Sequence, residues 1–264
     1  ASELLIYNIA KVPPFELEKS GSQNLASEDL RLKYRYLDLR RPQLQSNIRM
    51  RAKAVAAIRQ YFDTRGFIEI ETPILLKSTP EGARDFIVPS RIHTGKFFAL
   101  PQSPQILKQI TMISGFDKYF QIARCFRDED LRADRQPEFT QLDMEMSFVN
   151  REQVYREIEG MFNHVMKLIG VEFPTEWPRM THAEAIRRYG SDKPDLRFEM
   201  ELKDLSAVLK DTDFAPFRDT LDKGGEVKCI VVKGRAEYSR KQTDELQEYV
   251  KRYGAGALAW IKIA

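Results

Sequence analysis

Two alternating segments, residues 119–127 and 139–148, place the strongest constraint on how this chain folds. Successive side chains of a β-strand point to opposite faces of the sheet. In the second segment, Gln141, Asp143 and Glu145 alternate with large apolar residues, and the first segment alternates in the same way. The pattern therefore predicts a β-hairpin with one polar face and one apolar face.

The connection between these segments, residues 128–138, is an 11-residue charged loop, much longer than a tight turn. A hairpin with one solvated side would explain the alternation by itself. The polar face, however, is rich in carboxylates and amides and could also present Arg127. Long charged loops on a rigid hairpin often carry function. The second interpretation is therefore a binding site on this face.

Helical and strand patterns flank the hairpin. Apolar residues recur at steps of three and four in several segments, and alternation or apolar runs mark others. The predicted helices cover residues 47–65, 103–114, 152–170 and 243–252. The predicted strands cover residues 4–9, 67–73, 227–232 and 258–263. Because an isolated strand is unstable, strand 4–9 predicts a preceding N-terminal domain that has been cut away.

Two further segments carry candidate polar groups. Ser103, followed by Pro104, is predicted to cap the helix that contains Gln105 and Lys108. Residues three apart lie on one helix face, so this segment is either an ordinary capped helix or part of a site. A polar loop over residues 78–85 follows the predicted strand 67–73.

Composition narrows the functional classes. The 264 residues include 42 Lys and Arg against 39 Asp and Glu, a net charge of only +3, so any nucleic-acid contact must come from local charge. Two cysteines, Cys125 and Cys229, and three histidines show no metal-ligand or disulfide spacing, which favours a reducing compartment. No apolar run reaches the ~18 residues of a membrane helix, and no signal peptide is visible.

The longer motifs resemble those of class II aminoacyl-tRNA synthetases, specifically aspartyl-tRNA synthetases of bacterial type. Helix 47–65, Gly66 and the strand ending at Pro73 resemble motif 1, and residues 126–141 resemble motif 2. Residues 79–85 resemble the family's flipping loop, and residues 102–108 its aspartate-recognition segment. Residues 189–197 are similar to a stretch after motif 2, so the resemblance runs from about residue 4 to the end.

The resemblance implies an α+β fold in which an antiparallel class II catalytic sheet is flanked by helices. Residues 1–15 would end an anticodon-binding oligonucleotide barrel, and residues 16–29 would be a linker. Residues 30–198 would form the N-terminal part of the catalytic domain, and residues 199–264 the start of the α+β insertion domain. Motif 1 implies a homodimer, and the family implies a cytoplasmic location.

The implied activity is aspartate–tRNA ligation, in which ATP converts L-aspartate to aspartyl-adenylate and the aspartyl group passes to the 3′ end of tRNA. Arg127 would be catalytic and would bridge both substrates. The aspartate-binding residues would be Glu81, Ser103, Gln105, Lys108, Arg127, Gln141 and Asp143. The ATP-binding residues would be Arg127, Asp128, Glu129 and Gln136, and Arg132 and Arg135 would contact the tRNA acceptor end.

The sequence departs from the family pattern in lacking motif 3, the Gly-rich stretch whose arginine holds ATP. The chain is therefore expected to be a fragment that is inactive alone, with the Mg²⁺ ligands of the intact enzyme outside it. A free-standing paralogue that binds tRNA, amino acid or protein without ligating is a second hypothesis. A synthetase for asparagine or lysine is a third, although Gln105 with Lys108 and the long motif 2 argue against it.

Overall fold

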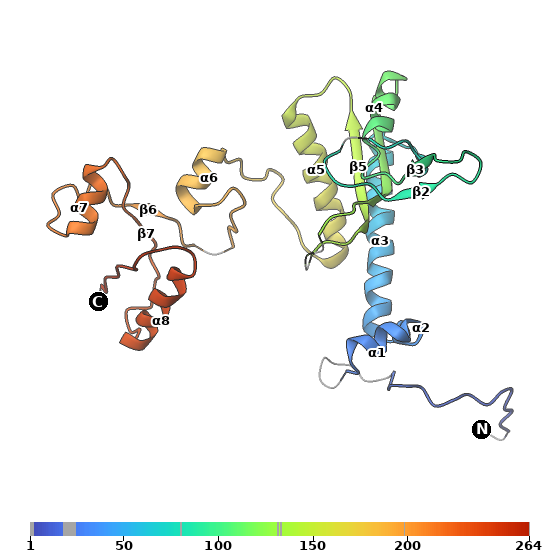
Figure 1. Cartoon of the computed structure of the whole chain (residues 1–264), viewed down its shortest axis with the longest axis horizontal. Coiled ribbons are helices and arrows are strands. Elements are labelled where there is room, and N and C mark those ends of the chain that lie inside the picture. The colour runs from blue at the N-terminus through green and yellow to red at the C-terminus, as the bar shows by residue number, and fades with distance from the viewer. Residues whose placement is uncertain are drawn as a thin grey trace. The chain divides into compact units, whose positions relative to one another are not determined.

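The computed structural model describes residues 3–17, 25–79, 81–130, 132, 134–197 and 199–263 (Figure 1). The chain forms two compact units, residues 1–177 and 178–264. The units therefore divide after Trp177, whereas the predicted boundary between catalytic and insertion domains lies after residue 198. That assignment of domain identity stays a prediction, as does the linker. Residues 18–24 of the linker lie outside the described residues, and its last two residues begin the first helix.

The first unit combines helices with two small sheets. Its helices are α1 (Glu28–Lys33), α2 (Arg35–Asp38), α3 (Pro42–Thr64), α4 (Gln105–Ile113) and α5 (Arg151–Met166), followed by the 3₁₀ turn η1 (Lys167–Ile169). Its strands are β1 (Ile68–Glu69), β2 (Ile87–Pro89), β3 (Phe97–Ala99), β4 (Lys118–Phe126) and β5 (Glu138–Met146). One sheet has the order β1-β4-β5, and β2 pairs with β3 in the other.

The larger sheet is mixed, which corrects the expectation of a purely antiparallel sheet. β4 and β5 pair antiparallel along their whole length, as alternation predicted, whereas β1 runs parallel to β4. β1 contains two residues, much less than the predicted strand 67–73, because only Ile68 and Glu69 pair in register with β4. The mixed α and β character of the unit is confirmed.

Helix α3 is longer than the sequence pattern indicated. It begins at Pro42, which occupies the first turn, where the missing N–H of proline costs nothing. It ends as predicted at Gly66, whose φ of 77° is the left-handed conformation that glycine adopts without a steric penalty. The long helix α3 is therefore followed directly by β1.

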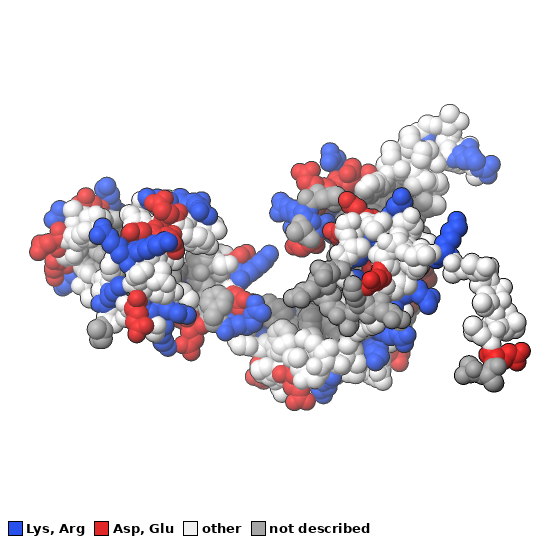
Figure 2. Space-filling model, turned by 90° about the horizontal axis from the view of Figure 1, so that it is seen from below, with Lys and Arg blue, Asp and Glu red and all other residues white. Residues whose placement is uncertain are grey.

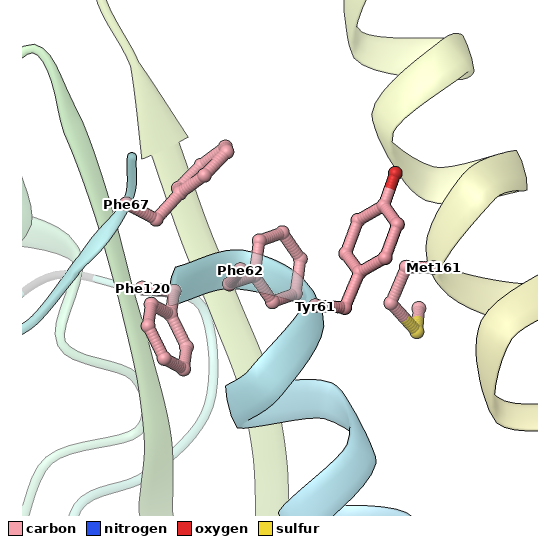
Figure 3. Packing of buried hydrophobic residues seen from close by; sticks show 5 residues of the cluster. All are labelled: Tyr61, Phe62, Phe67, Phe120 and Met161. Carbon is pink, nitrogen blue, oxygen red and sulfur yellow. The ribbon is translucent and has the colours of Figure 1, made fainter. Parts of the chain in front are cut away.

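The core of the first unit lies between the sheet and helices α3 and α5 (Figure 3). The rings of Phe62 and Phe120 stack with centroids 5.0 Å apart, and Phe67 meets Phe62 edge-on at 4.8 Å. Tyr61 and Met161 extend this cluster toward α5. Aromatic pairs at these separations add to the stabilisation from burial, so the helix-facing side of the hairpin contributes to the stability of the first unit.

A buried carboxylate anchors the approach to α3. The side chain of Asp38 is fully buried and lies within reach of Arg35 at 3.0 Å, Arg41 at 3.2 Å and Arg31 at 3.7 Å. A buried charge is costly unless it is paired and hydrogen-bonded. The arginine-rich stretch before α3 therefore has a structural role, because it neutralises this one acid.

Two predicted strands are wrong. Residues 4–9 and 258–263 form no strand, and the side chains of Leu4 and Ile263 are 83% and 85% exposed. A strand needs a neighbour to receive its backbone hydrogen bonds, and within the described residues neither segment has one. Apolar character alone predicted these strands, whereas pairing decides whether a strand forms.

The second unit contains α6 (His182–Tyr189), β6 (Lys203–Asp204), α7 (Ala215–Asp222), β7 (Lys228–Cys229) and α8 (Arg240–Lys251). β6 and β7 pair antiparallel, so the predicted strand 227–232 is shortened to two residues. The helix predicted over residues 243–252 begins three residues earlier, where Ser239 and Gln242 form a capping box.

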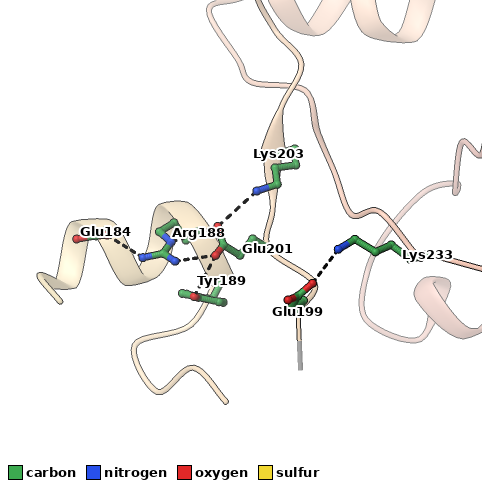
Figure 4. A network of polar contacts seen from close by, with 7 residues as sticks. All are labelled: Glu184, Arg188, Tyr189, Glu199, Glu201, Lys203 and Lys233. Atoms are coloured by element: carbon green, nitrogen blue, oxygen red, sulfur yellow. Dashed lines mark hydrogen bonds and ion pairs between the residues drawn. The ribbon is translucent and has the colours of Figure 1, made fainter. Parts of the chain in front are cut away.

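A polar network joins α6 to the chain before β6 (Figure 4). Arg188 pairs with Glu201 at 2.6 Å and with Glu184 at 2.9 Å, and the hydroxyl of Tyr189 donates to Glu201 at 3.4 Å. The hydrogen bond from Arg188 lowers the pKa of Glu201 to about 2. Arg188 and Glu201 keep 29% and 31% of their side chains exposed, so water weakens the pair and the network mainly orients the two segments.

Surface charge is mixed in each unit. Lys and Arg side chains are interspersed with Asp and Glu on the face drawn in Figure 2, in keeping with a net charge of +3. Among the residues that the structure describes, no helix is long and apolar enough to cross a membrane. Cys125 is buried and Cys229 half-buried, and both are free thiols.

Candidate active site

The polar face of the β4–β5 hairpin is arranged as its alternation predicted. In the register of the two strands, Gln121 lies opposite Asp143, and Ala123 lies opposite Gln141. Their neighbours Phe120 and Met144 point to the other side, into the core. One face of the hairpin therefore packs in the core, and the other face carries the polar side chains.

Helix α4 places Lys108 against this face. The Nζ of Lys108 donates to Oδ1 of Asp143 at 2.6 Å and lies 3.3 Å from Oε2 of Glu145. The side chains of Lys108 and Asp143 are only 12% and 8% exposed. Burial by itself would lower the pKa of Lys108, but the hydrogen bond and charge of Asp143, helped by Glu145, raise it. Lys108 is therefore a fixed cation at neutral pH.

The loop over residues 78–85 brings a third carboxylate to α4. Glu81 accepts hydrogen bonds from the hydroxyl of Ser103 at 2.7 Å and from the hydroxyl of Thr79 at 3.1 Å. The prediction that Ser103 caps α4 is wrong, because Pro104 holds the cap position without a side-chain bond. The Ser103 hydroxyl is instead used by Glu81. Pro80 of this loop lies outside the described residues.

Arg127 lies on the same side of the hairpin. Its guanidinium sits 5.2 Å from the ring centre of Phe139, which pairs with Cys125 across the two strands. The backbone N–H of Arg127 donates to Pro137 at 2.9 Å and closes the base of the long loop. Arg127 therefore stands at the end of the polar face, as its position in the alternation predicted.

Cys125 is a buried thiol on the same face of the hairpin. Burial, assisted by Asp143, raises the pKa of its thiol to about 11, while the positive charges of Arg127 and Lys108 act in the opposite direction. Its thiol also donates to the amide oxygen of Gln141 at 3.5 Å. The contacts thus form two groups on one face of the hairpin: Cys125 with Gln141, and Lys108 with Asp143.

Gln105 is the first residue of α4 and is half-buried. It lies one helical turn before Lys108, so the two share a helix face. That placement agrees with the spacing argument from the sequence.

The long loop is arranged differently from the buried cluster. Glu129 and Arg135 lie 3.8 Å apart as an exposed ion pair, and the N–H of Arg135 donates to the carbonyl of Arg132 at 3.0 Å. Arg132 and Gln136 are exposed. Leu131 and Ala133 lie outside the described residues. The predicted ATP and tRNA contacts on this loop are thus solvent-facing.

Asp128 connects the long loop to the loop over residues 78–85. Its N–H donates to the carbonyl of Arg84 at 3.1 Å, and Nε of Arg84 donates back to the carbonyl of Asp128 at 3.3 Å. The two carboxylate-bearing loops therefore meet at one backbone bridge.

A polar groove of about 690 Å³ lies on the first unit, next to the polar face of the hairpin. Its lining includes Arg51, Arg59, Glu69, Arg124 and Thr140, and none of the predicted site residues. The arginines in it already have partners, for example Arg59 with Glu69 at 2.9 Å. The groove lies beside β1 and also borders Gln121 and Ala123 of the polar face and Pro104 at the start of α4.

Metal ligands are not gathered in the described part of the chain. Within the ranges that the structure describes, no group of three or more His, Cys, Asp or Glu side chains could hold a metal ion.

Comparison with known proteins agrees with the motif resemblance. Residues 27–255 match the family model described as tRNA synthetases class II (D, K and N). The chain is 58% identical over 264 residues to the aspartate–tRNA ligase of Staphylococcus haemolyticus (strain JCSC1435) and 57% identical to that of Staphylococcus aureus (strain N315). Each match includes 99% of this chain but only 45% of the relative. The chain therefore spans less than half the length of these proteins.

A solved structure of an aspartyl-tRNA synthetase from Leishmania major Friedlin is also similar. It superposes with a TM-score of 0.52 at 25% identity, over 60% of this chain and 31% of that one. The shared part supports the mixed helix and sheet architecture of the chain.

Proposed function

The chain belongs to the class II tRNA synthetases (D, K and N), and we propose that the full-length protein that contains it is an aspartate–tRNA ligase. Identity of 58% to a curated aspartate–tRNA ligase supports this specificity within the family. The observation that carries the proposal is the buried Lys108, held by Asp143 and Glu145 on the polar face of the hairpin.

The proposed reaction has two steps. The α-carboxylate oxygen of aspartate attacks the α-phosphorus of ATP, and the bond to pyrophosphate breaks, giving aspartyl-adenylate. A hydroxyl of the terminal ribose of tRNA then attacks the aspartyl carbonyl, and AMP leaves. Because the first nucleophile is already an anion, no protein base is required, and catalysis depends on positioning and on charge stabilisation.

Lys108 is the proposed reader of the aspartate side chain. Lys108 contacts two acids, Asp143 and Glu145, and a third acid, Glu81, is held by Ser103 just before α4. Bound aspartate would add its side-chain carboxylate to Lys108 and offer its ammonium group to Glu81 and Asp143. Asparagine presents a neutral amide, which matches the ammonium of Lys108 poorly and would be rejected.

Arg127 is the proposed catalytic group. Its planar guanidinium can donate two hydrogen bonds side by side, which suits a bridge between the α-phosphate and the aspartate carboxylate. Gln141 would bind the same carboxylate, and Ser103 and Gln105 would complete the pocket. The ring of Phe139 beneath Arg127 supports this orientation.

The exposed loop is the proposed contact for ATP and tRNA. Asp128, Glu129 and Gln136 would lie at ATP, with Glu129 accepting from the adenine amino group. Arg132 and Arg135 would contact phosphates of the acceptor end. The weak Glu129–Arg135 pair at 3.8 Å can exchange for these ligands at low cost.

The remaining assignments follow from the family and belong to the proposal. The full-length protein would act in the cytoplasm as a homodimer through motif 1 (helix 47–65 and strand 67–73), with ATP as substrate and Mg²⁺ bound by residues outside this chain. Residues 1–15 and 199–264 would belong to the anticodon-binding and insertion domains.

The decisive experiment replaces Lys108 by alanine in the full-length protein. We expect the KM for aspartate to rise roughly 100-fold, because a buried charge contact is lost, with the KM for ATP changed less than about threefold. Pyrophosphate exchange measured against each substrate gives both values. Lys118→Ala is the matched control, because Lys118 donates to the carbonyl of Arg65 at 3.0 Å, away from the cluster. An equal loss for both substrates would count against Lys108 as the side-chain reader.

A further inference from the structure

Gln102 is a buried amide whose hydrogen bonds all go to one loop. Only 2% of the residue is exposed. Its Nε2 donates to the carbonyl of Ala83 at 2.8 Å and to Oδ1 of Asp85 at 2.5 Å. Its Oε1 accepts from the N–H of Ala83 at 3.1 Å. One side chain therefore holds both backbone groups of Ala83 together with the carboxylate of Asp85.

The loop is shaped to receive this amide. Gly82 has a φ of 94°, a conformation that L-residues rarely adopt, and a Cβ added there would meet no atom within 4 Å. The glycine is therefore needed for its backbone angle, which turns the N–H and C=O of Ala83 toward Gln102. Asp85 is fixed a second time, because the hydroxyl of Ser78 donates to its Oδ2 at 2.5 Å.

Gln102 is also the chain neighbour of Ser103, which donates to Glu81. Two adjacent residues thus bind two parts of one loop. Ser103 binds the carboxylate of Glu81, and Gln102 binds the backbone of Ala83, two residues later. Leaving a buried N–H or C=O without a partner costs roughly 1–3 kcal/mol. Loss of the Gln102 amide would remove the partner of two backbone groups at once, the N–H and the C=O of Ala83, and would leave Asp85 with the bond from Ser78 alone.

We propose that Gln102 is a positioning residue that fixes the loop over residues 78–85 so that Glu81 stands at the substrate site. The role of Glu81 toward an amino acid rests on the proposed function, whereas the hold on the loop does not. Gln102 does not touch the cluster around Lys108 and acts only through the loop. Its substitution should therefore weaken binding of the amino acid and leave ATP binding unchanged.

The first test uses the 264-residue chain and no substrate. Arg84 lies in the loop with 75% of its side chain exposed, so trypsin reports how often the loop opens. In Gln102→Met, which keeps the size and removes the amide, we expect cleavage after Arg84 to be roughly tenfold faster. Gln109→Met is the matched control, because Gln109 is an exposed glutamine of α4.

Asp85→Asn provides a second variant that keeps the shape of the loop. It removes the charge that Gln102 and Ser78 contact and should also speed cleavage at Arg84 selectively. Unchanged cleavage at Arg84 in both variants overturns the proposal. Equal acceleration at sites throughout the chain also overturns it, because Gln102 would then be a general stabiliser.

The second test uses the full-length protein. Gln102→Met should raise the KM for aspartate roughly tenfold with little change in the KM for ATP, and Gln109→Met should change neither. Faster cleavage at Arg84 with no change in the KM for aspartate would overturn the link to Glu81. If Lys108→Ala also leaves the KM for aspartate unchanged, the proposed function fails. Selectively faster cleavage after Arg84 in Gln102→Met would still show that Gln102 fixes the loop.

Discussion

The two faces of the β4–β5 hairpin are made from alternate residues of the same strands, yet they differ in what they contribute. The face with Phe120 and Met144 packs against α3 and α5 and holds the core. The face with Gln121 and Asp143 carries polar side chains that are also buried, but against α4 and its lysine. Burial alone therefore does not distinguish core from site, whereas the partner that causes the burial does.

The largest expected effect is on the core face. Phe120→Ala should lower the free energy of unfolding by about 4 kcal/mol, because a 2% exposed ring that stacks on Phe62 is replaced by a cavity. Urea denaturation of the 264-residue chain measures this loss. Phe148→Ala is the control, because Phe148 is 97% exposed just beyond β5 and should change stability by less than about 0.5 kcal/mol. Similar losses for both variants would contradict the assignment of the core.

The second effect concerns the thiol buried under the polar face. Burial raises the pKa of Cys125 from 9.0 to about 11. Between these values the folded chain keeps a proton that the unfolded chain has lost, so the stability of the wild type falls as the pH rises through this window. Relative to Cys125→Ala, the wild type should lose about 2 kcal/mol in unfolding free energy across it.

Urea titrations of the two proteins at several pH values measure this difference. Between pH 7 and pH 8 it should be constant, because the thiol is protonated in both states. A constant difference up to pH 11 would mean that the polar face around Cys125 is open to water, and the contrast between the two faces would then weaken.

Sequence periodicity predicted this contrast because it is a local property. The register of Gln121 with Asp143, and the side on which each residue lies, follow from alternation once the strands pair. The start of α3 at Pro42 was missed because the apolar stripe begins later than the helix does. Local signals thus identify an element more reliably than its ends.

Long-range contacts could not be read from the sequence. Ser103 has the sequence context of a helix cap, but its hydroxyl donates to Glu81, 22 residues earlier. The contacts of Gln102 gave no signal in the sequence, because its partners Ala83 and Asp85 lie in a loop whose path depends on the whole fold. The strand predicted over residues 258–263 lacked a neighbour for the same reason. In each case the structure depends on a partner that is distant in the sequence, which local patterns do not identify.

The smallest expected effect separates charge from burial. Arg124 and Glu138 face away from the site, with Nη1 and Oε1 2.7 Å apart, nearly the 2.6 Å of Lys108 and Asp143. Their side chains, however, are 53% and 54% exposed, against 12% and 8% for the buried pair. Water and salt screen an exposed pair, so a double-mutant cycle with Arg124→Gln and Glu138→Gln should give a coupling of about 0.3 kcal/mol that fades in high salt.

The same cycle on Lys108 and Asp143, with Lys108→Met and Asp143→Asn, should give a coupling several times larger that salt hardly changes, because removing one partner strands a buried charge. Urea unfolding at low and high salt measures both cycles. Equal couplings at the two sites would mean that distance alone sets the strength of these pairs. Burial under α4 would then no longer explain why Lys108 is a fixed cation, and the difference between the two faces would reduce to side-chain composition.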